Sequence, residues 1–148
     1  MSAPVPAVRT EQQVKRRARV VEAAMALAAK GGYEAVQMRA VSQEADVALG
    51  TIYRYFASKD QLLIAALDQL AEGMQETMLG QPPVGETVED RVMDVFRRCC
   101  ALLEAEPRLT HAMVTALSSS DPEVSAIAEG VRERMRALIA AAVAGESI

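Results

Sequence analysis

The sequence of 148 residues contains no tryptophan, three tyrosines, two phenylalanines, two cysteines and one histidine. The chain is poor in aromatics, and Ala, Val, Leu and Met dominate it, which favours helices over a β-sandwich or barrel. The adjacent Cys99 and Cys100 cannot connect distant segments by a disulfide, which indicates a reduced, cytoplasmic protein. A zinc site or a Ser-His-Asp triad would have to be built around His111 alone.

Long hydrophobic runs are also missing. No apolar run approaches the roughly 18 residues of a membrane-spanning helix, and the N-terminus lacks the charged start and apolar stretch of a signal peptide. Hydrophobic residues make up 51% and charged residues 24% of the chain, which is typical of a folded protein rather than a disordered one. We therefore expect about one globular domain that does not enter a membrane.

Acidic residues outnumber basic ones, which gives a net charge of −4, but the basic residues are concentrated in the first part of the chain. Residues 1–60 contain nine Lys or Arg against six Asp or Glu, whereas residues 61–148 contain seven against fourteen. A basic end on an acidic body indicates an anionic partner there, although small charge asymmetries are common. The basic cluster at residues 15–19 is either a solvated helix face or a surface for nucleic-acid phosphates.

Hydrophobic periodicity and helix-end signals predict seven helices and no strand. Gly32 ends the first helix, Ser58 caps the fourth, and Thr87 opens the fifth with a capping box. Residues 1–10 hold two prolines and no periodicity, so we expect a flexible tail there. The predicted helices cover residues 11–30, 38–45, 49–56, 59–79, 88–103, 107–117 and 122–144.

Residues 37–60 form the most informative stretch. Two short helices joined by a tight turn predict a helix-turn-helix, whose second helix would read the major groove of DNA. Ile52 and Phe56 lie four residues apart and are expected to anchor that helix in the core, so its other positions can offer hydroxyl and guanidinium donors to DNA. Gly50 weakens the helix but allows close approach to a duplex. Asp46 suits the turn and is expected to cap the helix predicted at residues 49–56.

The motif G-Y-E-A-V-Q-M-R-A-V-S-Q-E-A-D-V-A-L-G-T-I-Y-R-Y-F-A-S-K-D-Q-L-L, from Gly32 to Leu63, resembles the TetR family of bacterial transcriptional repressors. The resemblance implies an all-α fold: a three-helix helix-turn-helix DNA-binding head at residues 11–58, then a helical effector-binding and dimerisation body at residues 59–148. Two positions depart from the family pattern, because Asp46 replaces a common Gly and Ala48 a common Ser or Thr. The DNA contacts that the resemblance implies are Arg39, Leu49, Gly50, Thr51, Tyr53, Arg54, Tyr55 and Lys59.

Residues 30–41 and 45–56 are similar to those of TetR repressors that control sterol (cholesterol) catabolism. This similarity implies control of sterol or lipid catabolism genes through a double-stranded, pseudo-palindromic DNA operator. It also implies an apolar small-molecule inducer, a steroid coenzyme A thioester, and a homodimer. Family members have nine helices, so either the C-terminal helices that pair the subunits are missing from this chain or the protein dimerises differently.

The predicted body contains methionines and other apolar residues that form either ordinary core or the wall of a ligand pocket. We expect the apolar side of the fifth helix, including Val88, Phe96 and Leu103, to face inward. The candidate pocket residues are Met74, Met78, Met93, Phe96, Cys100, Leu103, His111, Met113, Leu117 and Met135.

The sequence shows no metal-ligand cluster, phosphate-binding loop or nucleophile–base pair, so we expect neither an enzyme nor a bound cofactor or metal. A regulatory DNA-binding protein is the main hypothesis. The alternative is a helical small-molecule-binding or interaction protein that shares the three-helix head but has no operator of its own.

Overall fold

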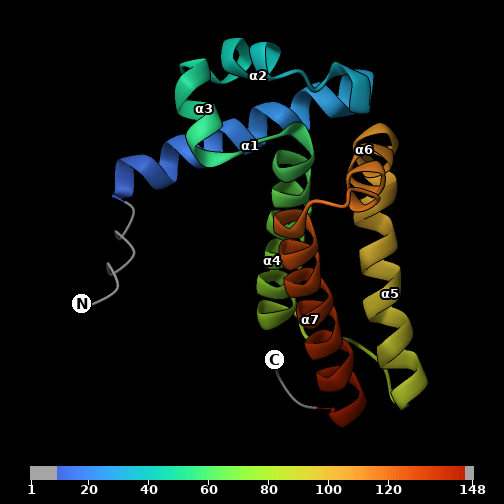
Figure 1. The fold of residues 1–148 in the computed structure, drawn as a ribbon. Coiled ribbons are helices and arrows are strands. Elements are labelled where there is room, and N and C mark those ends of the chain that lie inside the picture. The colour runs from blue at the N-terminus through green and yellow to red at the C-terminus, as the bar shows by residue number, and fades with distance from the viewer. Residues whose placement is uncertain (1–9, 146–148) are drawn as a thin grey trace.

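The computed structural model describes residues 10–145, and within them it contains seven α-helices, one short 3-10 helix and no strand (Figure 1). The all-α prediction is therefore confirmed. The tail expected at residues 1–10 lies outside the described residues except for Thr10, which caps the first helix. The elements are α1 (Glu11–Gly31), η1 (Tyr33–Ala35), α2 (Met38–Ala45), α3 (Leu49–Tyr55), α4 (Lys59–Gly80), α5 (Val88–Ala105), α6 (Pro107–Leu117) and α7 (Pro122–Ala144).

Side-chain caps define most of the helix starts. The hydroxyl of Ser58 accepts a hydrogen bond from the Gln61 amide at the start of α4, as predicted. Thr87 and Asp90 form the predicted capping box of α5, in which each side chain accepts from the other residue's backbone amide. Gly32 ends α1 at a φ of 75°, a conformation that side chains rarely adopt.

The turn between α2 and α3 depends on Asp46, which takes the left-handed conformation with a φ of 54°. The Ser42 hydroxyl donates to the Val47 carbonyl at 2.6 Å, and the Val47 amide donates back to the Ser42 carbonyl at 3.2 Å. Asp46 thus completes the C-terminal end of α2. The expectation that it caps α3 is wrong, because the N-cap of α3 is Ala48 and no side chain caps it.

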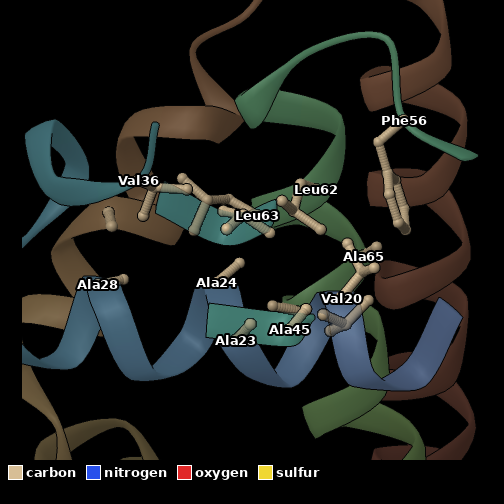
Figure 2. Close-up of a cluster of buried hydrophobic side chains, with 14 of the residues drawn as sticks. Val20, Ala23, Ala24, Ala28, Val36, Ala45, Phe56, Leu62, Leu63 and Ala65 are labelled. Atoms are coloured by element: carbon tan, nitrogen blue, oxygen red, sulfur yellow. The ribbon is translucent and has the colours of Figure 1, made fainter. Parts of the chain in front are cut away.

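One core joins the head, defined here as α1, η1, α2 and α3, to the adjoining parts of α4 and α6. Figure 2 shows Ala24 and Ala28 of α1 facing Val36, Leu62 and Leu63, which belong to the same packed cluster. From α6, Leu109 and Met113 join the same core. Packing therefore continues across residues 58 and 59, where the sequence predicts a domain boundary.

The body, defined as α4 to α7, extends away from the head, with α4, α5 and α7 side by side (Figure 1). It holds two smaller apolar clusters, one around Met78 and Leu138 and the other around Ile64 and Val124. The Arg91 Nε donates to the Ala142 carbonyl at 2.8 Å and ties α5 to the end of α7. Across residues 10–145, every helix is too short or too polar to cross a membrane.

Candidate DNA-binding surface and apolar cavity

Helix α3 is held by one face and open on the other. Ile52 is fully buried and Phe56, directly after the helix, is 2% exposed, which confirms both as core anchors. Tyr53 is 50% exposed, and Gly50 and Arg54 are also exposed. The open face of this short helix thus presents a hydroxyl, a guanidinium and bare backbone to solvent. The remaining predicted contacts on α3 are half-buried: Leu49, Thr51 and Tyr55.

Gly50 has no structural need to be glycine. A Cβ at this position would meet no heavy atom within 4 Å in the described part of the chain, and its φ is not positive. Because glycine in a helix is about 1 kcal/mol less favourable than alanine, its presence lowers stability. The bare backbone at Gly50 therefore leaves this face of α3 open.

Basic side chains border α3 on two sides. Arg39 is exposed on α2, and Arg17 from α1 places its guanidinium 4.9 Å from the centroid of the Phe56 ring. Lys15 forms an exposed ion pair with Glu11 at 3.3 Å, a contact worth little in solution. Arg17 is thus the member of the basic cluster at residues 15–19 that lies against the C-terminal end of α3.

Lys59, the first residue of α4, lies against Tyr33. Its Nζ is 3.8 Å from the centroid of the Tyr33 ring and 3.4 Å from the Tyr33 carbonyl oxygen. The Tyr33 hydroxyl donates to Asp60 Oδ1 at 2.7 Å, and this hydrogen bond to a carboxylate, with burial, raises the pKa of Tyr33 to about 12. Sequence reasoning missed Tyr33, because its partners Lys59 and Asp60 lie 26 and 27 positions away along the chain.

An apolar cavity of about 90 Å³ lies between α4, α5 and α7. Among the described residues that line it, Arg134 alone carries a charge. Its Nε lies 3.4 Å from Asp68 Oδ1, and its Nη1 donates to Gln75 Oε1 at 2.9 Å. The cavity is otherwise walled by Leu67, Leu70, Ala71, Met74, Cys99, Leu102, Leu103, Val131, Met135 and Leu138.

The ten predicted pocket residues separate into groups. Met74, Leu103 and Met135 line the cavity, and Met78 is buried beside it. Cys100 and His111 instead line an open groove between α5 and α6, to which Leu103 also contributes. Met113 belongs to the core shared with the head. The remaining members, Met93, Phe96 and Leu117, are exposed outside both.

The placement of α5 explains this separation. The helix packs on α7 along one narrow side, where Val95 is buried, so the inward orientation expected for Val88 and Phe96 is wrong: they are 42% and 44% exposed. Adjacent residues point about 100° apart on a helix. Cys99 therefore faces the cavity, where burial raises the pKa of its thiol, while Cys100 is exposed.

A helix-turn-helix with an open second helix, joined to a helical body that contains an apolar cavity, is the architecture of a helix-turn-helix regulator. The chain belongs to the TetR family. The family model of bacterial regulatory proteins, tetR family, matches residues 20–66. The model of the tetracyclin repressor-like, C-terminal domain matches residues 85–147.

Relatives and solved structures agree with this assignment. The chain is 41% identical over 131 residues to the HTH-type transcriptional repressor KstR of Rhodococcus jostii, covering 88% of this chain and 61% of KstR. It is 38% identical over 135 residues to KstR of Mycobacterium tuberculosis, covering 91% and 61%. The chain thus spans less than two thirds of the length of these relatives.

Two crystal structures are similar in fold. A TetR transcriptional regulator from Rhodococcus sp. RHA1 superimposes with a TM-score of 0.81 and 31% identity, covering 90% of this chain and 72% of that one. The multidrug binding protein EbrR complexed with ethidium gives a TM-score of 0.65 and 27% identity, covering 86% and 75%.

Proposed function

We propose that this protein is a ligand-responsive, sequence-specific DNA-binding transcriptional repressor of the TetR type, and not an enzyme. The observation that carries the proposal is the open face of α3. Tyr53 and Arg54 are exposed there, while Ile52 and Phe56 are buried and anchor the helix. Donors on a rigidly anchored, exposed helix suit the major groove, which admits an α-helix. Similarity to KstR, a transcriptional repressor, supports the same role.

In the proposed complex, α3 enters the major groove. Arg54 would donate to a guanine edge, and the bare backbone at Gly50 would allow the helix to lie deep. Tyr53, Tyr55 and Lys59 would bind phosphates, which position the protein without reading sequence. The full proposed interface is Arg39, Leu49, Gly50, Thr51, Tyr53, Arg54, Tyr55 and Lys59.

The operator would be a pseudo-palindrome bound by a homodimer, with two recognition helices about 34–36 Å apart. Because the spacing of the heads sets the match to successive major grooves, a change in the body can release DNA without altering α3. Residues 11–58 would act as the DNA-binding unit and residues 59–148 as the effector-binding unit.

The inducer would enter between α4, α5 and α7. The apolar walls favour an apolar ligand, and the resemblance of residues 30–41 and 45–56 to repressors of sterol catabolism implies a steroid coenzyme A thioester as inducer and sterol catabolism genes as targets. The cavity of about 90 Å³ is smaller than the ~300 Å³ or more of typical ligand pockets, so a steroid would have to move these helices apart. A ligand that binds only the opened body shifts the population toward it.

Gln61 offers a path from the body to α3. Its Oε1 accepts from the Ala57 amide at 2.9 Å, and its Nε2 donates to Asp121 Oδ2 at 2.8 Å. Asp121 also caps α7, which lines the cavity. A displacement of α7 would therefore pull on Gln61 and shift the residues that directly follow α3.

The test is a gel-shift assay of the full chain on DNA from upstream of its own gene, at two salt concentrations, with and without a steroid coenzyme A thioester. We expect a specific complex that weakens with salt and is released by the thioester. A specific complex that ignores the thioester would remove the ligand assignment. Absence of specific binding, including in a version extended at the C-terminus, would favour the interaction-module alternative.

A further inference from the structure

We propose that Tyr33 is a positioning residue for DNA binding: its ring and its carbonyl hold the Lys59 ammonium where it can bind a backbone phosphate. The inference rests on the proposed function, because it assigns to Tyr33 the orientation of one proposed phosphate contact. Tyr33 itself is not proposed to touch DNA.

The contacts leave Lys59 partly engaged and partly free. An ammonium has three N–H donors. One of them is directed to the Tyr33 carbonyl at 3.4 Å, and the ring face lies 3.8 Å from Nζ at the centroid. Lys59 as a residue is half-buried, and the hydrogen bond to the Tyr33 carbonyl uses only one of the three donors. Its flexible stem is thus ordered before DNA arrives, which lowers the entropy lost when a phosphate binds.

Tyr33 is itself fixed at both ends. Its backbone lies in η1, directly after the Gly32 turn, and its ring packs against the core of the head. Its hydroxyl donates to Asp60 Oδ1 at 2.7 Å, which ties the ring to the residue that follows Lys59. This hydrogen bond, with burial, raises the pKa of Tyr33 to about 12, and the protonated phenol is the donor in it.

The electrostatics of the helix start make such support necessary. A cation in the first turn of a helix is disfavoured by the positive end of the helix dipole. Lys59 occupies the first position of α4 nevertheless. The electron-rich face of Tyr33 and the carboxylate of Asp60 offset that repulsion and keep the ammonium near the N-terminus of α4, where amide groups and the dipole also attract a phosphate.

The experiment measures how DNA affinity depends on salt, using fluorescence anisotropy with a labelled duplex of mixed sequence. The slope of log K against log salt is negative, and each lost phosphate contact reduces its steepness, meaning its absolute value, by about 0.9. We compare the wild type with Lys59→Ala, Tyr33→Leu, Tyr33→Phe and the double variant Y33L/K59A, after circular dichroism has established that each is folded. Tyr33→Phe is the matched control, because it keeps the ring and the carbonyl and loses only the hydroxyl.

We expect Lys59→Ala to reduce the steepness of the salt dependence by about 0.9. Tyr33→Leu should also reduce this steepness, and it should weaken binding about twofold to fivefold at low salt. Tyr33→Phe should keep the wild-type slope. Adding Tyr33→Leu to Lys59→Ala should change nothing more. A purely structural role predicts the opposite: Tyr33→Leu would weaken binding at an unchanged slope and would still do so without Lys59, which would overturn the inference.

Two further readings keep the test decisive. If Tyr33→Leu is unfolded, the ε-methylene protons of Lys59 are measured by NMR in the wild type and in Tyr33→Phe, where stacking on the ring should shift them upfield in both; unshifted resonances overturn the inference. Wild-type protein that does not bind duplex DNA at all refutes the proposed function and the inference together. Salt-dependent wild-type binding with the same slope in Lys59→Ala refutes the inference alone.

Discussion

The head and the body use their apolar side chains differently. In the head, small and branched residues of α1, α2, α3 and the start of α4 form one continuous core, and Ile52 and Phe56 fix α3 to it. In the body, the apolar residues that do not join this core fall into two separate clusters with a cavity nearby, and several large ones remain exposed on α5 and α6. A surface that must match DNA needs fixed geometry, whereas a region that must admit a ligand needs contacts that can be exchanged at low cost.

The strongest test of this comparison is truncation in each region. Phe56→Ala should lower the free energy of unfolding by about 3–5 kcal/mol, because it empties a site that is closely packed on all sides. Met135→Ala, at the edge of the cavity and only half-buried, should lower it by less than about 2 kcal/mol. Urea denaturation followed by circular dichroism measures both. Equal losses would mean that the body is packed as tightly as the head.

The open face of α3 is expected to separate affinity from stability. Arg54→Ala should weaken binding to a specific operator by about 1–3 kcal/mol through the loss of a bidentate contact. The free energy of unfolding should change by less than about 0.5 kcal/mol, because the side chain is exposed. Anisotropy titration and urea denaturation of the same preparation give the two numbers. A large stability loss with unchanged affinity would remove Arg54 from the interface and assign it to the fold.

The link between the two regions should have a smaller effect on stability. Gln61→Ala removes the hydrogen bonds to the Ala57 amide and to Asp121, so we expect a loss of about 1–2 kcal/mol. It should also reduce the effect of the inducer on DNA affinity, because α7 would no longer be tied to the residues after α3. Glu72→Ala, an exposed change on the same helix, is the control. An unchanged inducer response in Gln61→Ala would mean that coupling runs through the shared core instead.

The sequence predicts helix starts well where their signals are local. The caps at Ser58 and Thr87 are confirmed, since a cap involves residues three positions apart. The contact between Tyr33 and Lys59 joins residues 26 positions apart, so no local pattern predicts it. In the body, periodicity identifies the apolar stripe of α5 but not which neighbour covers it, which explains why Phe96 was expected inside and is exposed.

Gly50 gives the smallest expected change in stability and the sharpest separation of the two roles of α3. Since a Cβ there meets nothing within 4 Å of the described chain, Gly50→Ala should raise the free energy of unfolding by about 0.5–1 kcal/mol. The same methyl group would stand on the face proposed to approach the duplex, so DNA affinity should fall. Gly73→Ala on α4, where a Cβ is equally free, should raise stability without changing affinity. If Gly50→Ala left DNA affinity intact, the backbone of α3 would not lie close to the groove, and the depth proposed for its insertion would be wrong.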